Sequence, residues 1–450
     1  MIVGFSHFKI DAEKAFAIVS LLFYSELLAF QSLFTLSEGE GVTLFSPPYD
    51  SPLTPLLRLT QHGIFLVTLG LLALRWRQTL RASTKGFFIW GLILLTLVSF
   101  LWSDTPTMTQ RGSISLLETT LFGLYFAARF SRQEQLNLLA ICGTLFATTS
   151  LLFTLAVPSA AIEAGVHAGD WRGPLVQKNL FARGLVLFAT VAYINQPESF
   201  WGRGMRLFSL LLCIALIVLS GSRTGIVILI LMLGTVELQR FLYSLFNSLP
   251  KLFVPAVCAA ILAVAAAIVA VVNSAETIVE ATGQNITLSG RTEIWSALVT
   301  KIGERPLLGY GYQGFWRGIY GESAYIGKVF DNTYLPPHSH NGFFEITLAF
   351  GLLGLGLFAL SYLLNARFAL LLPAAVPQTI SLWPLAYLTF VVLYNQTEST
   401  LVAHNSIFWV LYVALTFSKV TERETAEVLE PQKKNRSIDW HSRNAVNSHS

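Results

Sequence analysis

The chain has 450 residues, of which 53% are hydrophobic and only 12% are charged, and its formal net charge is +4. The charged fraction is about half of the roughly 25% typical of a soluble domain, which excludes a soluble enzyme, and the small net charge argues against nucleic acid as a partner. Apolar stretches recur along nearly the whole chain, so neither a single anchor nor a cleaved signal peptide explains them.

Apolar runs of roughly 15 to 22 residues, long enough to cross a bilayer, occur about twelve times. In chain order the expected spans are 15–34, 56–74, 87–101, 114–128, 136–157, 180–194, 207–219, 226–238, 253–272, 343–363, 380–394 and 401–417. The three cysteines fall inside such runs, where they pack as small hydrophobes. The expected fold class is therefore an all-α polytopic membrane protein with about twelve transmembrane helices.

Basic residues are unevenly divided between the two sets of connecting loops. One set carries Lys9, Lys14, Arg75, Arg77, Arg81, Lys85, Arg129, Arg132, Arg203, Arg206, Arg240, Lys251 and Arg367. The positive-inside rule places this set, and with it both termini, in the cytoplasm. The expected organisation is spans one to nine in 1–272, a large extracytoplasmic loop in 273–341, spans ten to twelve in 342–418, and a cytoplasmic tail in 419–450 that is polar and expected to be disordered.

The large loop between the ninth and tenth spans is far longer than an ordinary connection, and loops of that length are usually functional or disordered. It contains Trp295 and Trp316, which favour an ordered structure. Two other external features are the segment 164–179 and the tight turn 220–225. We expect the chemistry in these three places.

The external segments contain several cations in spite of the positive-inside rule: Arg172, Lys178, Arg183, Arg223, Arg291, Arg305 and Arg317. A guanidinium near a membrane boundary is costly unless it snorkels, pairs or faces a wet cavity. Its planar fork matches phosphate oxygens, and a diphosphate presents several of them close together. An anionic ligand is one interpretation; the alternative is snorkelling or pairing with Glu118, Glu237 or Glu345.

A histidine pair lies where the large loop enters the membrane, in the sequence Pro-Pro-His-Ser-His-Asn-Gly at 336–342. His338 or His340 could accept a proton from a sugar hydroxyl near neutral pH. In the alternative interpretation Asn341 is only a helix N-cap and the histidines are solvated. A His-x-His pair can also hold a metal, but no carboxylate or cysteine cluster lies beside it in sequence, so no metal is expected.

Three carboxylates, Glu26, Glu118 and Glu398, lie in or beside the apolar runs. In transporters such residues relay protons, but each could equally pair with a neighbouring basic or polar group. We therefore leave them out of the expected catalytic set.

Five short motifs follow one another in a fixed order: Gly169-Asp170-Trp171-Arg172-Gly173 with Lys178-Asn179, Ser220-Gly221-Ser222-Arg223-Thr224, Gly290-Arg291-Thr292-Glu293-Ile294-Trp295, Arg305-Pro306-Leu307-Leu308-Gly309-Tyr310-Gly311, and His338-Ser339-His340-Asn341-Gly342 followed by Gly351 and Gly354. Together they resemble the O-antigen ligase and polysaccharide polymerase superfamily, and within it bacterial exopolysaccharide polymerases. The resemblance covers about 171–354. The catalytic His-Asn pair of that family corresponds to His340-Asn341.

The resemblance implies a GT-C-like fold in the bacterial cytoplasmic (inner) membrane and a metal-independent, inverting glycosyltransferase without cofactors. The donor would be a glycan on a polyprenyl diphosphate, and the acceptor a glycan or lipid, which leaves polymerase and ligase both open. A flippase and a chain-length regulator would be further partners. The implied residues are His340 and His338 for catalysis, Arg172, Lys178, Arg223, Arg291 and Arg305 for the diphosphate, and Asn179, Asn341 and Glu293 in support.

Two other classes of function stay open: a secondary transporter of a small anion or solute, and a non-catalytic scaffold for a polysaccharide machine. Against transport stand the large loop with its histidines and arginines and the lack of paired Gly/Pro-interrupted helices in two halves. Against a scaffold stands the number of cations at predicted span ends.

Overall fold

A computed structural model of the chain describes residues 11–34, 52–197, 199–246, 291–318, 321–329, 336–371 and 378–418. These residues form helices and turns, with one isolated β-bridge between Ile162 and Trp171. The helices are α1 (Ala12–Tyr24), α2 (Thr54–Leu74), α3 (Trp76–Ser83), α4 (Phe87–Val98), α5 (Pro106–Arg129), α6 (Arg132–Ala156), α7 (Pro158–Ala161), α8 (Lys178–Ile194), α9 (Phe200–Leu219), α10 (Arg223–Phe246), α12 (Arg291–Glu304), α13 (Ala324–Val329), α14 (Gly342–Leu371), α15 (Gln378–Tyr394) and α16 (Ile407–Phe417). Short 3-10 turns η1 (Leu27–Ala29), η2 (Gln31–Leu33), η3 (Ser99–Leu101) and η4 (Gly165–His167) complete the described part.

The described helices include several that can cross a membrane. Five are long and apolar enough, at Thr54–Leu74, Arg132–Ala156, Phe200–Leu219, Arg223–Tyr243 and Gly342–Leu370, and the number rises to 7 if two bent pairs are each one span. The bent pairs are α1 with 27–33, at 71°, and α3 with 87–101, at 91°. The chain is therefore a polytopic membrane protein. The count of twelve and the placement of the large loop stay predictions, and the expected span 253–272 lies outside the described residues.

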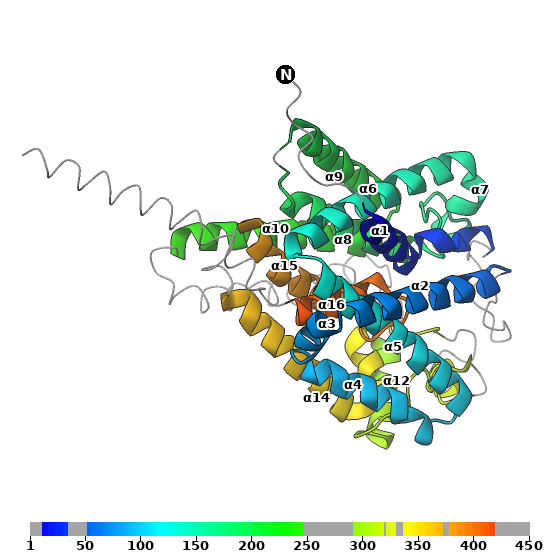
Figure 1. Cartoon of the computed structure of the whole chain (residues 1–450). Coiled ribbons are helices and arrows are strands. Elements are labelled where there is room, and N and C mark those ends of the chain that lie inside the picture. The colour runs from blue at the N-terminus through cyan, green and yellow to red at the C-terminus, as the bar shows by residue number, and fades with distance from the viewer. Residues whose placement is uncertain are drawn as a thin grey trace, which may run out of the picture.

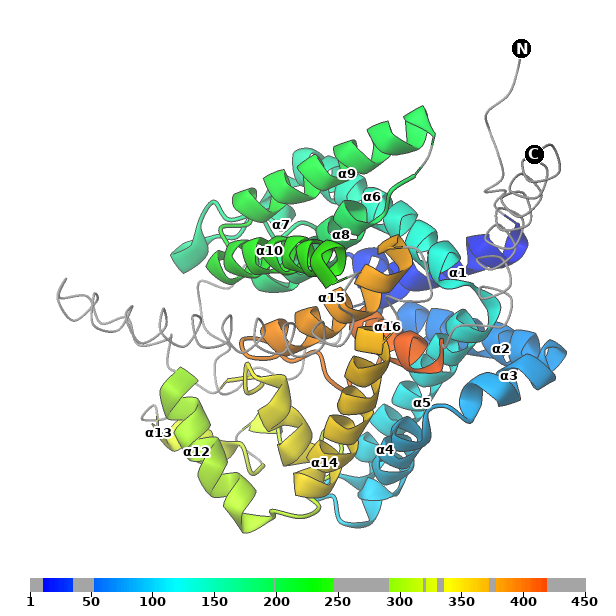
Figure 2. The ribbon, with the colours of Figure 1, turned by 90° about the vertical axis from the view of Figure 1, so that its left-hand side faces the viewer.

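Two groups of helices enclose a buried centre. Figure 2 shows α6, α8, α9 and α10 gathered on one side, α2, α4, α5 and α14 on the other, and α15 and α16 between them. Every residue of α16 is buried, and so is nearly all of α8. A helix that is apolar on all sides belongs in the interior. Small residues allow close contacts here, because a Cβ at Gly123 of α5 would lie 2.7 Å from Val413 of α16.

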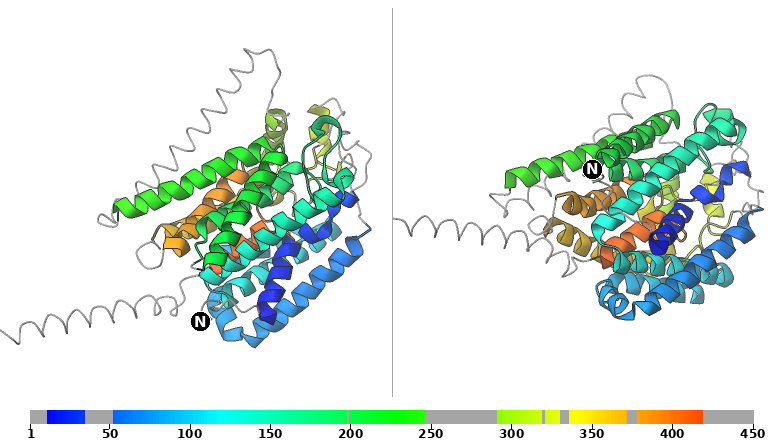
Figure 3. Two further views of the ribbon diagram at one scale, coloured as in Figure 1. Left: turned by 90° about the horizontal axis from the view of Figure 1, so that it is seen from above. Right: turned by 45° about the horizontal axis from the view of Figure 1, so that its top comes forward.

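Three of the basic positions predicted to face the cytoplasm, Lys14, Arg75 and Arg129, form salt bridges that join several helix ends. Glu13 at the start of α1 pairs with Arg75 after α2 and with the Nε of Arg129 at the end of α5, the latter at 2.6 Å. Lys14 lies 3.8 Å from Glu134 in the first turn of α6. These salt bridges join the start of α1 to the ends of α2 and α5 and to the start of α6, and Figure 1 and Figure 3 show how these helices lie in the bundle.

The described part of the predicted large loop is ordered. It forms α12, α13 and tight turns around a small apolar core, and Leu348 of α14 closes that core. The other buried members are Ile294, Ala297, Leu298, Tyr310, Phe315 and Ile326. The core fixes α12 against α14 and so positions the first residue of α12, Arg291.

Helix α14 is broken at Gly351, where the backbone has φ 62° and ψ −161°. The turn 305–311 fills the break by exchanging main-chain hydrogen bonds: Tyr310 N donates to Leu348 O at 2.7 Å, and Leu352 N donates to Pro306 O at 2.7 Å. A Cβ at Gly351 would lie 2.2 Å from the carbonyl carbon of Leu307. Only glycine fits there, because both the positive φ and the backbone contact exclude a side chain.

Candidate functional site

The loop that carries the two histidines is fixed by the helix that follows it. Asn341 Oδ1 accepts hydrogen bonds from the main-chain amides of Phe343 and Phe344, at 2.9 and 3.2 Å, so Asn341 is the N-cap of α14. Glu345 in the first turn accepts from Ser339 N at 2.6 Å and from the indole of Trp316 at 3.0 Å. The capping alternative is thus confirmed for Asn341, and it fixes the backbone between the histidines.

The two histidines contact each other and are largely removed from solvent. Their ring centroids are 4.1 Å apart, and the side chain of His340 is 18% exposed, so the expectation of solvated histidines in the capping alternative is wrong. Burial, together with the positive charge of Arg291, lowers the pKa of His338 to about 3 and that of His340 to about 4. Both rings are therefore neutral near pH 7.

The hydrogen bonds distinguish the two rings. The main-chain amide of His340 donates to His338 Nδ1 at 3.1 Å, so a neutral His338 carries its proton on Nε2. His340 itself has φ 51°, in the left-handed region that non-glycine residues rarely adopt. Strain of this kind costs about 1 to 3 kcal/mol and is found most often at functional sites.

A carboxylate from a distant part of the chain completes the cluster. Glu398 follows α15 and is 2% exposed; its Oε2 lies 3.9 Å from His340 Nδ1, and its Oε1 lies 3.8 Å from a terminal nitrogen of Arg291. Burial raises the pKa of Glu398, and the charges of Arg183 and Arg291 oppose that rise. Arg183 of α8 donates to Ser399 O at 3.4 Å and lies 4.7 Å above the ring of Phe408.

Several buried polar atoms in this region have no hydrogen-bond partner among the described residues. They are His340 Nδ1, Glu398 Oε2, Arg183 Nε, Ser399 Oγ, Tyr394 Oη and Glu293 Oε2. Leaving such an atom unpaired costs about 1 to 3 kcal/mol, and native proteins concentrate the exceptions where a ligand or water completes the bonding. The cluster of Arg183, Arg291, His338, His340 and Glu398, called the histidine cluster below, therefore has the properties of a binding site.

The histidine cluster also has ligand atoms spaced for a metal. One atom each of His338, His340 and Glu398 lie within 4.8 Å of one another. Sequence analysis missed this arrangement because Glu398 is distant along the chain. However, Arg291 acts electrostatically on all three residues and Arg183 on His338 and Glu398, and these positive charges favour an anion over a cation.

Two of the predicted donor-binding residues, Lys178 and Arg223, and the supporting residue Asn179 gather beside the start of α8. Lys178 and Asn179 occupy its first turn, and Arg183 follows on the same helix. Ser222, the residue before α10, donates to Asn179 Oδ1 at 2.9 Å, which brings Arg223 next to this turn. Lys178 pairs with Asp170 at 2.5 Å. The N-termini of α8 and α10 thus lie together, and the positive ends of both helix dipoles favour negative charge, as Glu163 shows by accepting from Lys178 N at 2.7 Å.

The structure places the other predicted cations elsewhere. Arg172 is 2% exposed and donates to the carbonyls of Ala160, Val176 and Ser32, so it ties the 160–176 segment together. Arg305 follows the far end of α12 from Arg291, 3.6 Å from Asp104. A helix rises 1.5 Å per residue, so the 14 residues of α12 put about 20 Å between its two ends. Arg317 lines a separate charged hollow with Lys301 and Lys328.

Sequence analysis missed two members of the histidine cluster as site residues. The sequence identifies Arg183 as an external cation but does not place it in the donor-binding set, and it does not place Glu398 in the catalytic set. Their common signal was a charge at the end of an apolar run. That signal is ambiguous without contacts, because Glu26 and Glu118 carry it as well.

Comparison with known proteins supports the sequence motifs. Residues 208–359, which contain α10, α12 and both histidines, match the family described as O-antigen ligase. The exopolysaccharide production protein ExoQ of Rhizobium meliloti (strain 1021) is 23% identical over 403 residues, which cover 87% of this chain and 90% of that protein. The ordered motifs, the apolar helices and these two matches agree: the chain is similar to proteins of the O-antigen ligase and polysaccharide polymerase family.

Proposed function

We propose that the chain is a membrane glycosyltransferase of polysaccharide or lipopolysaccharide biosynthesis. It transfers a glycan from a polyprenyl-diphosphate donor to an acceptor hydroxyl at the extracytoplasmic face of the bacterial cytoplasmic membrane. The observation that carries the proposal is the histidine cluster, in which two arginines, two neutral imidazoles and a carboxylate are buried together with unpaired polar atoms. The match of residues 208–359 to the O-antigen ligase family and the similarity to ExoQ support the substrate class.

The donor's diphosphate would bind between Arg183 and Arg291. Arg291 is the first residue of α12, so the positive end of that helix adds to its charge. Lys178, Asn179 and Arg223 lie beside the preceding turn of α8 and would contact the same lipid-linked group. As the bond from the anomeric carbon to the phosphate oxygen breaks, these cations stabilise the negative charge on the departing diphosphate.

His340 would take the proton of the acceptor hydroxyl. Its Nδ1 faces Glu398 at 3.9 Å, and closing that distance to a hydrogen bond leaves Nε2 as the basic atom. The acceptor oxygen then bonds to the anomeric carbon on the face opposite the diphosphate, which inverts the configuration. Glu398 stabilises the imidazolium that forms. His338 already accepts a main-chain hydrogen bond at Nδ1 and so acts as a donor through Nε2.

Substitutions at His340 test the role of the base. We expect His340→Ala and His340→Asn each to lower polymer formation in cells by at least about a hundredfold, the usual contribution of a general base. Asparagine adopts the left-handed backbone readily, so the second variant removes the base without adding strain. Glu398→Gln should lower activity by a smaller factor. Polymer is measured against the amount of the chain in the membrane fraction.

His441→Ala, in the 419–450 tail, is the matched control and should leave polymer unchanged. Activity near the wild-type level in His340→Asn would show that the residue serves the backbone and not the chemistry. Normal polymer in both His340 variants would remove the histidine cluster from the reaction.

A further inference from the structure

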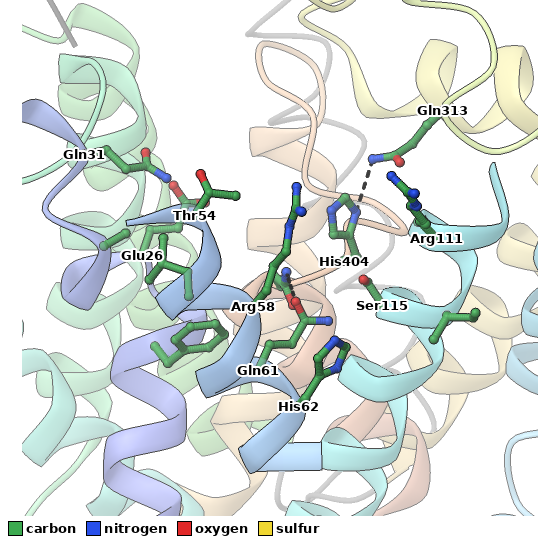
Figure 4. Close-up of a pocket in the computed structure, with 16 residues that line it drawn as sticks. Glu26, Gln31, Thr54, Arg58, Gln61, His62, Arg111, Ser115, Gln313 and His404 are labelled. Atoms are coloured by element: carbon green, nitrogen blue, oxygen red, sulfur yellow. Dashed lines mark hydrogen bonds between the residues drawn. The ribbon is translucent and has the colours of Figure 1, made fainter. Parts of the chain in front are cut away.

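An open cavity of about 590 Å³ lies beside the histidine cluster and contains none of its five residues. Figure 4 shows it between Glu26, Gln31 and Thr54 on one side and Arg111 and Gln313 on the other, with Arg58 and His404 between them. The volume falls within the roughly 300 to 1,000 Å³ of typical small-molecule sites, enough for a short oligosaccharide segment.

The cavity is linked to the histidine cluster through Glu26, and one chain connection carries residues of both. Glu26, which lines it, interacts electrostatically with Arg183, and Arg183 acts in turn on Glu398 and His338. His404 and Asn405, which also line it, belong to the same 395–406 connection as Glu398. An extended chain spans at most about 3.6 Å per residue, so Glu398 and Asn405 are less than about 25 Å apart.

The lining has the chemistry that sugar hydroxyls need, with donors and acceptors intermixed. Asn405 Nδ2 donates to Gln61 Oε1 at 2.8 Å, while Asn405 Oδ1 is buried without a partner among the described residues. His404 Nδ1 lies 3.1 Å from the hydroxyl of Tyr312 and 3.4 Å from Gln313 Nε2. The lining also carries two cations, Arg58 and Arg111, and one carboxylate, Glu26, and its Gln61 donates to the buried carboxylate of Glu118.

The backbone around the cavity is strained. Glu26, Gln313 and Asn405 have φ values of 66°, 58° and 54°, in the left-handed region, and all three line the cavity. Such conformations cost about 1 to 3 kcal/mol each and persist only where the surroundings enforce them. Three of them around one hollow, together with the unpaired oxygen of Asn405, indicate a site shaped for a ligand.

We propose that this cavity binds the acceptor glycan and holds the sugar that receives the new bond at its Glu26 side, next to the histidine cluster. The inference rests on the proposed glycosyl transfer. The cations assigned to the donor, Lys178, Arg223 and Arg291, lie on α8, α10 and α12 and do not line the cavity. Apart from Gln313, the lining comes from outside residues 208–359, the stretch matched by the family, as expected of a part that recognises a particular acceptor.

The test uses the full chain purified in lipid nanodiscs. The probe is a repeat-unit oligosaccharide released from the host's own polymer, titrated by ligand-observed NMR. Arg111→Gln removes a cation of the cavity, and Ser115→Leu fills part of it. Each should weaken oligosaccharide binding roughly tenfold, the effect of losing one charge-assisted hydrogen bond or its space. Arg203→Gln, on α9 and away from the cavity, is the matched control and should bind as the wild type does.

A transfer assay separates the acceptor from the donor. Arg111→Gln and Ser115→Leu should raise KM for the acceptor and leave KM for the lipid-linked donor unchanged. A raised donor KM with unchanged oligosaccharide binding would assign the cavity to the donor and overturn the proposal, as would equal oligosaccharide binding in all variants. Unchanged melting temperatures show that the variants are folded.

The oligosaccharide-binding measurement does not depend on catalysis. If the wild-type chain binds the oligosaccharide and the two cavity variants do not, the cavity is a glycan site even if no transfer is seen, and only the proposed transfer fails. If transfer is lost in His340→Asn while Arg111→Gln keeps full oligosaccharide affinity, the transfer stands and the cavity assignment fails.

Discussion

At the scale of single residues, the arginines near the histidines differ in what holds them. Arg172 is saturated by main-chain carbonyls, whereas Arg183 keeps a buried Nε without a partner among the described residues. Arg291 lies beside Glu398 and acts on both histidines. A guanidinium next to neutral imidazoles is suited to a phosphate oxygen. Their position in the histidine cluster therefore makes Arg183 and Arg291 better candidates than Arg172 and Arg305 for binding the diphosphate of the proposed donor.

This ranking predicts different outcomes for the same conservative change at different arginines. Arg183→Lys and Arg291→Lys should each lower transfer at least about tenfold, because an ammonium cannot make the bidentate contact although it keeps the charge. Arg305→Lys should stay within about twofold of wild type, since Arg305 lies at the other end of α12. Initial rates with purified protein and lipid-linked donor give the comparison. Equal losses in all three variants would contradict the separation of Arg305 from the site.

At the scale of elements, the break in α14 joins the large loop to the membrane helices. The turn 305–311 donates to and accepts from the main chain on both sides of Gly351, so the loop and helix share one hydrogen-bonded unit. Gly309, with φ 61°, lies against Leu348 O in the same contact. The sequence of that turn is one of the ordered motifs, and its glycines serve backbone packing.

Two glycines of α14 test whether the backbone contact with the turn 305–311 requires a glycine. Gly351→Ala should destabilise the protein by about 3 kcal/mol or more, because the new Cβ meets backbone atoms of Leu307 and Leu308 and the positive φ is unfavourable. Gly356→Ala meets nothing within 4 Å and should be neutral or slightly stabilising. Thermal unfolding in detergent and the amount of chain in the membrane fraction report the difference. Similar melting temperatures for both variants would mean that the turn does not depend on Gly351.

At the scale of the whole molecule, separate helices and connections contribute charged or titratable groups to a common region. Arg183 comes from α8, Arg291 from α12, the histidines from the turn before α14, and Glu398 from the connection after α15. Three of these groups could hold a metal by their spacing, while the two arginines favour an anion. The choice between these interpretations concerns how the departing diphosphate is neutralised.

We expect glycan transfer by the purified chain in nanodiscs to continue in the presence of excess EDTA, because arginines supply the positive charge that a divalent cation supplies in many soluble transferases. The rate should change by less than about twofold, and added magnesium or manganese should not raise it. A rate that disappears with chelator and returns with either ion would make His338, His340 and Glu398 metal ligands.

The sequence by itself determined which segments form helices and where along the chain the histidine loop meets a helix. Apolar runs of the right length define membrane helices, because a backbone in lipid must satisfy its hydrogen bonds internally. The described expected spans correspond to helices, although α16 begins at Ile407 and not near 401, and α1 and α4 are short and bent at their ends. Asn341 before an apolar helix is a local capping signal. It marks where the loop enters the helix, and so where the neighbouring His338 and His340 lie.

The tertiary structure alone decided which charges meet. Glu398 is 58 residues from His340, as the two residue numbers show, and its role depends on α15 packing against α10 and α14. Arg172 and Arg183 look alike in sequence, yet one is held by carbonyls and the other keeps free donor capacity. Charge type and local spacing can be read along the chain, whereas burial, pairing and the cavity beside the histidine cluster arise from contacts between helices that only the folded bundle brings together.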